Sequence, residues 1–343
     1  MELFVGLDVS QNETSVCVID GTGRTCWQGR CASTPEAIAA TVAARAPGAV
    51  RVGLETGSLS TWHWHALNGL GVPVVCLDAR HAKAALSLKV NKSDANDALG
   101  LAQIVRTGWF REVRAKSMAS HRTRAVLVAR AQLVAARVDV GNQMRGVLKT
   151  FGHVVGPALG RAFERRVEEL AGDDPTLRPL MAGLLAVWRT LREQVEALDR
   201  QLLRLARSNA AAQRLMTVPG IGSITALAFL STVDDPGRFA KSKGVGAYLG
   251  LTPTRYQSGE VDRSGRISKR GDPLLRTYLF EAAGTLLTRV ARWSALKAWG
   301  VRLAKRAGLK KAKVAVARKL AVVLHRIWAD GSEFAWSAAE ARP

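Results

Sequence analysis

The chain has 343 residues, with 50 Lys+Arg against 28 Asp+Glu, which gives a formal net charge of +22 at pH 7. At about 150 residues per domain this length predicts two domains, and 48% hydrophobic residues exclude a wholly disordered chain. The basic excess predicts a polyanionic partner such as nucleic acid, because clustered Lys and Arg neutralise phosphates and release their counterions.

The basic charge is concentrated toward the C-terminal end. Residues 1–100 hold 8 Lys+Arg and 9 Asp+Glu, whereas residues 236–343 hold 22 and 7, a net charge of +15. The N-terminal part is therefore expected to do something other than bind phosphate by bulk charge.

Several other classes of protein are excluded by the sequence. The four cysteines form no CxxC pair, which argues against a zinc site and against a disulfide scaffold. Glu2 and Asp8 interrupt the N-terminal apolar run, so no secretory signal is expected. Because no uncharged apolar run reaches about 18 residues, no membrane span is expected either. We expect a cytoplasmic protein.

The first part of the chain alternates between strand and helix patterns. Short apolar runs predict strands at 3–10, 14–20, 24–31, 51–56 and 72–79. Helices are predicted at 35–46, 62–70, 81–88 and 92–108, the last with Ser93 as its N-cap. Three hairpin strands followed by alternating helices and strands predict a mixed α/β sheet covered on both faces, which is the order of a ribonuclease H-like fold.

The middle of the chain is predicted to be helical. A long Arg-rich helix is expected at 117–150, followed by a helix that ends near residue 170 and another at 177–207. The last has a coiled-coil-like apolar seam made of Leu184, Val187, Leu191, Val195, Leu198, Leu202 and Leu205. This seam could join two helices of one chain or form a dimer interface.

The last third mixes apolar helices with a basic, glycine-rich stretch. Two apolar helical segments flank the turn VPGIG (218–222), and residues 250–273 are expected to be loop or short strand. Further helices are predicted at 274–290 and 310–328.

Four carboxylates occupy positions where the predicted elements would bring them together. Asp8 interrupts an apolar strand, Glu55 ends a second strand, and Asp94 and Asp97 share one helix face. Carboxylates this close raise one another's pKa unless divalent cations neutralise them. All-oxygen ligands suit Mg²⁺ or Mn²⁺, and a pair of such ions can hold the oxygens of a transferred phosphoryl group. Taken singly, each acid could be an ordinary turn or helix-start residue.

The segments that carry these acids, GLDVS (6–10), GLETG (53–57) and NKSDANDA (91–98), resemble the three acidic motifs of the DEDD transposases, the IS110 family of insertion-sequence recombinases. The resemblance covers about residues 3–328. It implies a RuvC-like domain in which Asp8, Glu55, Asp94 and Asp97 are catalytic and hold Mg²⁺. We accordingly expect a RuvC-like catalytic domain at 1–112, a helical, coiled-coil-like region for self-association and nucleic-acid contact at 113–210, a transposase domain at 211–330 and a tail at 331–343.

The second half resembles the same family. VPGIG is similar to the turn of the family's transposase domain and to a helix-hairpin-helix, in which Gly220 and Gly222 would let backbone N–H groups approach a phosphate. A tight turn without a ligand is the alternative. GLTPTRYQSG (250–259) resembles the segment around the family's nucleophilic serine, which maps onto Ser258. Sequence chemistry alone does not separate Ser258 from Ser264 and Ser268. The residues expected to neutralise phosphate are Arg255, Arg263, Arg266, Lys269 and Arg270.

The resemblance implies a DNA transposase that exchanges strands through a covalent phosphoserine and is guided by a structured non-coding RNA, the bridge RNA. The basic residues of 117–150 and 297–326 are candidates for contact with RNA or DNA, or else form a solvated basic face. A dimer or tetramer is expected. The alternative functions are a RuvC-like, Mg²⁺-dependent junction endonuclease that uses water, and a nucleic-acid-binding protein with an inactive nuclease fold. His63 and His65 are interpreted as packing or surface residues.

Overall fold

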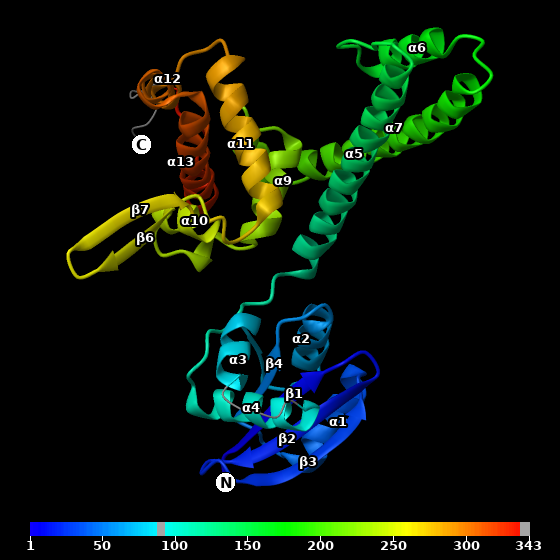
Figure 1. Ribbon diagram of the computed structural model, residues 1–343. Coiled ribbons are helices and arrows are strands. Elements are labelled where there is room, and N and C mark those ends of the chain that lie inside the picture. The colour runs from blue at the N-terminus through cyan, green and yellow to red at the C-terminus, as the bar shows by residue number, and fades with distance from the viewer. Residues whose placement is uncertain (88–92, 337–343) are drawn as a thin grey trace. The chain divides into compact units, whose positions relative to one another are not determined.

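The computed structural model describes residues 1–87 and 93–336 (Figure 1). The chain divides into two compact units, Met1–Lys116 and Ser117–Pro343. The end of the helix predicted at 81–88, the first residue of the helix predicted at 92–108 and positions 337–343 of the predicted tail lie outside the described residues. None of the described helices combines the length and the apolar character that crossing a membrane requires.

The first unit contains a mixed five-stranded sheet, as predicted. Its strands are β1 (Leu3–Val9), β2 (Glu13–Asp20), β3 (Thr25–Ala32), β4 (Arg51–Glu55) and β5 (Val74–Leu77), in the order β3-β2-β1-β4-β5. β1, β2 and β3 pair antiparallel, whereas β1 with β4 and β4 with β5 pair parallel. The two parallel pairs need crossover connections, which the helices between these strands supply.

Helices cover both faces of this sheet. On one face, Val5 and Leu7 pack in a core with Ile38 of α1 (Pro35–Arg45) and Leu67 of α2 (Ser60–Gly69). On the other face, Phe4 shares a core with residues of α3 (Ala79–Leu86) and α4 (Asp94–Thr107). Successive residues of β1 thus enter opposite cores, as the two-residue period of a strand requires.

The second unit begins with a helical pair. α5 (Met118–Thr150) packs along α7 (Leu177–Arg207), and α6 (Gly160–Ala171) packs against α7. The predicted seam of α7 is only partly correct, since Val195 and Leu202 are buried but Val187 is 50% exposed. The buried line is instead Leu177, Met181, Leu185, Trp188, Val195, Leu202 and Ala206. The line differs because α6 joins α5 in covering the first half of α7, where Phe163 and Val167 enter the core.

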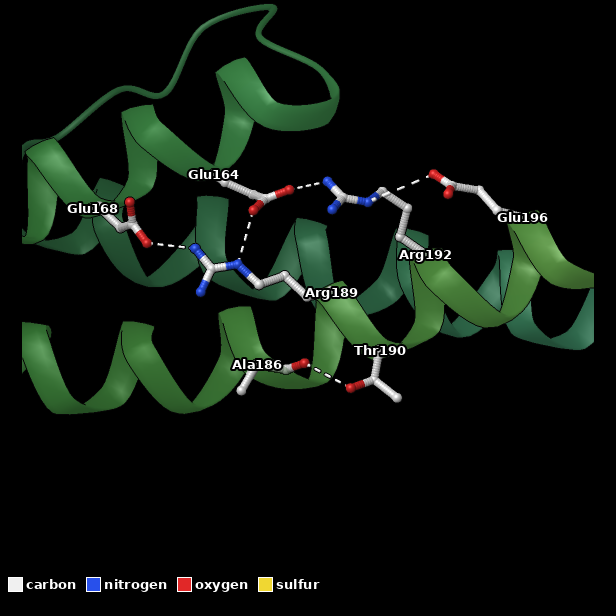
Figure 2. A network of polar contacts seen from close by, with 7 residues as sticks. All are labelled: Glu164, Glu168, Ala186, Arg189, Thr190, Arg192 and Glu196. Carbon is white, nitrogen blue, oxygen red and sulfur yellow. Dashed lines mark hydrogen bonds and ion pairs between the residues drawn. The ribbon is translucent and has the colours of Figure 1, made fainter.

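Charged side chains join α6 to α7. Figure 2 shows the carboxylate of Glu164 between two arginines of α7, with Arg189 donating to one oxygen at 2.8 Å and Arg192 to the other. Arg189 also pairs with Glu168, and Arg192 lies 3.8 Å from Glu196. Burial acts to raise the pKa of Glu164, but the hydrogen bond from Arg189 and the charge of Arg192 outweigh it, so the pKa lies below its ordinary value of 4.5.

Glu164→Ala is expected to lower the free energy of unfolding by about 2 kcal/mol at pH 7, because both arginines lose their shared partner. Since the folded-state pKa of Glu164 is lowered, its contribution is present above pH 4.5 and is lost as the pH falls through the lowered pKa. Urea denaturation at pH 7 and at lower pH measures this difference. Asp173→Ala, which breaks the exposed Arg178–Asp173 pair, is the control and is expected to change stability by under about 0.5 kcal/mol. An equal loss of unfolding free energy in Glu164→Ala and Asp173→Ala would contradict the stabilising role assigned to Glu164.

The rest of the second unit is a helical core with a projecting hairpin. Its helices are α8 (Ala210–Met216), α9 (Ser223–Val233), η1 (Pro236–Arg238), α10 (Lys243–Tyr248), α11 (Pro273–Thr288), α12 (Ala295–Ala307) and α13 (Leu309–Asp330). Every residue of α9 except Ser223 and Ile224 is buried, and the helix lies within the largest core cluster. The predicted helices 274–290 and 310–328 are confirmed as α11 and α13. Between them, α12 was not predicted; it ends next to Gly308, where α13 begins.

Candidate active site

The two strand carboxylates emerge side by side. Leu7 of β1 pairs with Leu54 of β4, so Asp8 and Glu55 are the next residues along two neighbouring parallel strands, whose spacing is about 4.8 Å. A Cβ on Gly6 would lie 2.0 Å from the Ala98 carbonyl oxygen of α4, and one on Gly53 would lie 2.4 Å from Val105 of α4.

These two glycines therefore place α4 directly on the sheet. Asp8 and Glu55 follow them by two residues and lie on the same face. Both residues are half-buried at the end of the sheet where β1 and β4 end.

The two helix carboxylates lie in the first turn of α4. The Ser93 hydroxyl caps this helix by accepting from the Asn96 N–H at 3.3 Å. Asp94 is exposed and lies 3.6 Å from Arg30 of β3, while Gln28 of the same strand donates to the Ala95 carbonyl at 2.7 Å. The first turn of α4 thus contacts β3, on the far side of β2 from β1. Asp97 is half-buried on this turn.

This arrangement fits a divalent cation in part. Asp8 and Glu55 provide adjacent carboxylate oxygens, the donor type that Mg²⁺ and Mn²⁺ prefer. Across residues 1–87 and 93–336, however, no three His, Cys, Asp or Glu side chains are arranged to hold one metal ion. Asp94 has one carboxylate oxygen, Oδ2, 3.6 Å from Arg30 of β3. The structure therefore brings two of the four predicted ligands together and holds the other two on α4.

A cavity of about 430 Å³ opens beside Glu55. Its lining includes the last residues of β1, the loop after β4 and the first residue of α2: Val9, Ser10, Gly57, Ser58, Leu59 and Ser60. The hydroxyls of Ser10 and Ser60 both donate to nearby backbone carbonyls, which fixes the two loops. Of the four candidate carboxylates, Glu55 lines this cavity, which provides space for part of a polar substrate next to that residue.

The glycine turn joins α8 to α9, and its two glycines differ in their surroundings. Gly220 has φ +89°, and a Cβ there would lie 2.6 Å from the Ala282 carbonyl oxygen of α11. Gly222 is exposed at the N-cap of α9, with φ −102°, and a Cβ there would meet no heavy atom within 4 Å. Gly220 is thus required for helix packing, whereas only Gly222 leaves its backbone open to a phosphate.

Gly220→Ala is expected to lower the free energy of unfolding by about 2 kcal/mol or more, because the new methyl group meets the backbone of α11 and the φ is strained. Gly222→Ala is expected to cost about 0.5 kcal/mol through the poorer N-cap. Thermal denaturation and DNA binding are measured for both variants. If Gly222 faces a phosphate, its variant weakens binding while it retains its melting temperature. A Gly220→Ala protein that melts like the original would contradict the packing argument.

Ser258 lies at the tip of an exposed hairpin. β6 (Pro253–Ser258) and β7 (Val261–Ile267) pair antiparallel, with Ser258 opposite Val261, and Figure 1 shows them projecting as an arm beside α10. Gly259 has φ +54° at the first position of the two-residue turn, the conformation of a type II′ hairpin. Of the two expectations for this stretch, loop or short strand, the structure has short strands over 253–258 and 261–267, and all of β6 is exposed.

The base of this arm is tightly built. A Cβ on Gly250, which has φ +66°, would lie 2.0 Å from the Arg270 carbonyl oxygen, so the two ends of the arm cross in close contact. Arg276 of α11 donates to the carbonyls of Arg270 and Leu249, at 2.9 and 3.2 Å. Lys269 and Arg270 are exposed at this base, and Arg266 is exposed on β7. The arm is therefore anchored where it leaves the helical core.

The basic residues of the arm do not share one environment. The guanidinium of Arg255 forms a two-bond ion pair with Asp262, from Nε to Oδ1 at 2.8 Å and from Nη2 to Oδ2 at 2.6 Å. The hydrogen bond from Arg255 lowers the pKa of Asp262, and the same contact raises the pKa of Arg255. Sequence reasoning missed Asp262, although a two-residue turn at Gly259–Glu260 would have placed it diagonally across from Arg255.

Several residues singled out in the sequence have structural roles. His63 is buried, with its ring nitrogens 2.9 Å from the Ser33 carbonyl and 3.1 Å from the Leu59 carbonyl, and His65 lies 2.8 Å from the Lys116 carbonyl. Their interpretation as packing residues agrees with these contacts. All four cysteines lie in the described part of the chain and form no disulfide with one another, and burial raises the pKa of Cys76 to about 12.

The basic face of the last two helices is partly occupied by intramolecular contacts. Lys319 lies 4.2 Å from the ring of Trp299, and Lys313 lies 5.2 Å from the ring of Phe280. Lys297 is buried and donates to the Val290 carbonyl, so it belongs to the fold. Most of the other lysines and arginines of α12 and α13 remain exposed.

Comparisons with known proteins find similarity to transposases in both units of the chain. Residues 212–299 match the family model described as "Transposase IS116/IS110/IS902 family", and residues 5–153 match a transposase model of the DEDD type from IS110 elements. The transposase for insertion sequence element IS1111A of Coxiella burnetii is 31% identical over 331 residues, which cover 95% of this chain and 88% of that protein.

Two further relatives are also named as transposases. The protein named "Probable family 20 transposase" of Pseudomonas aeruginosa is 32% identical over 69% of this chain and 72% of its own length. The transposase for insertion sequence element IS1328 of Yersinia enterocolitica is 30% identical over 72% of this chain and 75% of its own. The similarity to the Coxiella burnetii protein covers nearly the whole chain, and therefore most of both units.

Proposed function

The chain belongs to the IS110/IS116 family of insertion-sequence transposases, enzymes that cut and recombine DNA, and from this premise we propose a mechanism. We propose that Ser258 is the nucleophile and forms a covalent phosphoserine link to DNA, under the guidance of a structured non-coding RNA. Mg²⁺ would be held by Asp8, Glu55, Asp94 and Asp97. The observation that carries the serine assignment is its place at the exposed tip of an anchored, arginine-bearing arm.

The proposed step is a transesterification. The Oγ of Ser258 attacks the phosphorus, an Oγ–P bond forms, and one P–O bond to the sugar breaks. The proton of the serine hydroxyl is transferred, in net terms, to the released sugar oxygen. A second attack by a sugar hydroxyl on the phosphoserine restores the serine and joins the new strand. The number of phosphodiester bonds is conserved, so no external energy source is required.

The carboxylates of the first unit would act on the same phosphate. Bound Mg²⁺ supplies Lewis-acid polarisation of phosphate oxygens and offsets the charge that develops on them. Asp8 and Glu55 would hold it from the ends of β1 and β4, and Asp94 and Asp97 would complete its ligands from the first turn of α4. The serine and the carboxylates belong to different compact units of the chain.

We further propose how the remaining regions contribute. Residues 1–112 form the metal-dependent domain, residues 113–210 serve self-association and nucleic-acid contact, and residues 211–330 form the domain with the serine. The net charge of +15 over residues 236–343 supports contact with RNA and DNA backbones. A dimer or tetramer is also part of the proposal.

Strand exchange in solution tests this function. The purified chain is incubated with DNA that carries the joined ends of its element, a target DNA and RNA transcribed from the flank of the element. The proposal predicts joined recombinant DNA and a protease-sensitive protein–DNA adduct, both dependent on RNA and on Mg²⁺. Cleavage with free ends and no adduct would favour the junction endonuclease instead. Binding without any strand transfer in Mg²⁺ would favour the inactive-nuclease alternative.

A further inference from the structure

The two faces of the β6–β7 hairpin carry different chemistry. Directly opposed residues of an antiparallel pair lie on the same face, and successive residues alternate. Because Ser258 faces Val261 and Tyr256 faces Arg263, these four side chains share one face. Arg255 faces Ser264 and Gln257 faces Asp262, so these four share the opposite face. Ser258 and Arg255, although close in sequence, therefore project to opposite sides of the arm.

Arg255 is already occupied on its own face. The two hydrogen bonds to Asp262, at 2.8 and 2.6 Å, engage the Nε and Nη2 pair of donors, one of the pairs with which an arginine can hold a phosphate. This ion pair ties β6 to β7 close to the turn. It adds a side-chain link to the backbone pairing that holds the two strands in register.

Arg263, in contrast to Arg255, is not engaged by an acidic residue in the described part of the chain and lies on the face of Ser258. It is exposed, and within the described residues no hydrogen bond or ion pair holds its guanidinium. It is the diagonal neighbour of Ser258 on the same face. Diagonal neighbours are separated by about 7–8 Å, a distance that a long side chain can span. A phosphate held at the Ser258 hydroxyl would thus lie within reach of the free donors of Arg263.

We propose that Arg263, and not Arg255, is the catalytic residue that neutralises the phosphate attacked by Ser258, while the Arg255–Asp262 pair braces the arm. This inference rests on the proposed phosphoserine function. The planar guanidinium presents paired N–H groups to the non-bridging oxygens, whose negative charge increases as the fifth bond to phosphorus forms. Lysine carries the charge but not the paired donors, so it is expected to substitute only in part.

The test measures the rate at which the full-length chain forms its covalent adduct with labelled DNA carrying the joined element ends, with the flanking RNA and Mg²⁺. Arg263→Ala is expected to slow the adduct by about 10³-fold and Arg263→Lys by about 10-fold, whereas Arg255→Ala stays within about 5-fold of the original protein. All three substitutions are on the exposed arm, so circular dichroism and melting temperature are expected to remain unchanged.

A second substrate separates charge neutralisation from a structural role. In DNA with a methylphosphonate at the cleavage position, a methyl group replaces one charged oxygen, so less neutralisation is needed. On this DNA, the ratio of the adduct-formation rates of the original protein and Arg263→Ala is therefore expected to fall at least tenfold. The corresponding ratio for Arg255→Ala is expected to stay constant. If Ser258→Ala still forms the adduct, the proposed function fails. If Ser258→Ala is inactive but Arg263→Ala behaves like Arg255→Ala, or its deficit persists on methylphosphonate, this inference alone fails.

Discussion

Ser258→Ala is expected to abolish the covalent protein–DNA adduct and strand exchange, with a loss of at least about 10⁴-fold. The reason is chemical, because alanine has no oxygen to attack phosphorus. The side chain is exposed at the tip of the hairpin, so its removal leaves the core of the second unit untouched. Gel analysis of labelled DNA, with and without protease treatment, measures the adduct.

The matched control is Ser264→Ala. Ser264 is exposed on the same hairpin but faces Arg255, on the side away from Ser258. Its variant is expected to retain adduct formation within about threefold, as exposed substitutions away from a site usually do. Normal strand exchange by Ser258→Ala would exclude the serine mechanism, and loss of the adduct in Ser264→Ala alone would move the nucleophile to that residue.

Asp8→Asn and Glu55→Gln are expected to lower strand cleavage by at least about 10³-fold, because each change removes a charged oxygen ligand from the proposed Mg²⁺ site. Both amides have nearly the same shape as the carboxylates, so circular dichroism is expected to remain unchanged. Rates are measured over a range of Mg²⁺ and Mn²⁺ concentrations. A requirement for more metal in the variants would support direct ligation.

Glu13→Gln is the control for the acidic residues. Glu13 begins β2, and its neighbour Thr14 pairs with Val9 of β1, so it lies at the same edge of the sheet as Asp8. It is exposed and pairs with Arg30 at 3.4 Å. Its variant is expected to cleave normally. An equal loss of strand cleavage in all three variants would indicate that cleavage depends on the negative charge at this end of the sheet and not on metal ligation.

Much of the fold could be predicted from the sequence because local patterns determine it. The apolar runs of β1 and β4 alternate between two cores, and the predicted boundaries agree with the structure within about two residues. α10 was missed, since it has six residues and contains Gly244 and Gly246. The buried line of α7 was only partly predicted, because the period of a helix does not specify which neighbours cover it.

The candidate site, like the fold, was predicted only where local sequence patterns determine it. The neighbouring positions of Asp8 and Glu55 follow from two strands that pair parallel and end together, which the order of elements indicated. The roles of the arginines depend on hairpin register, and one residue of register changes the face of every side chain. Arg255 was therefore predicted as a phosphate ligand, and its pairing with Asp262 emerged only from the structure. Gly220 likewise needed α11 in place before its packing role was visible.

Mass spectrometry of the trapped adduct tests the central claim most directly. Trypsin cleaves after Arg255, Arg263, Arg266 and Lys269, so Ser258, Ser264 and Ser268 fall in three different peptides. After nuclease trimming of the DNA, the account predicts a nucleotide phosphate on the peptide 256–263, attached to Ser258. Attachment to either of the other two peptides, or cleaved DNA with no modified peptide, would contradict it.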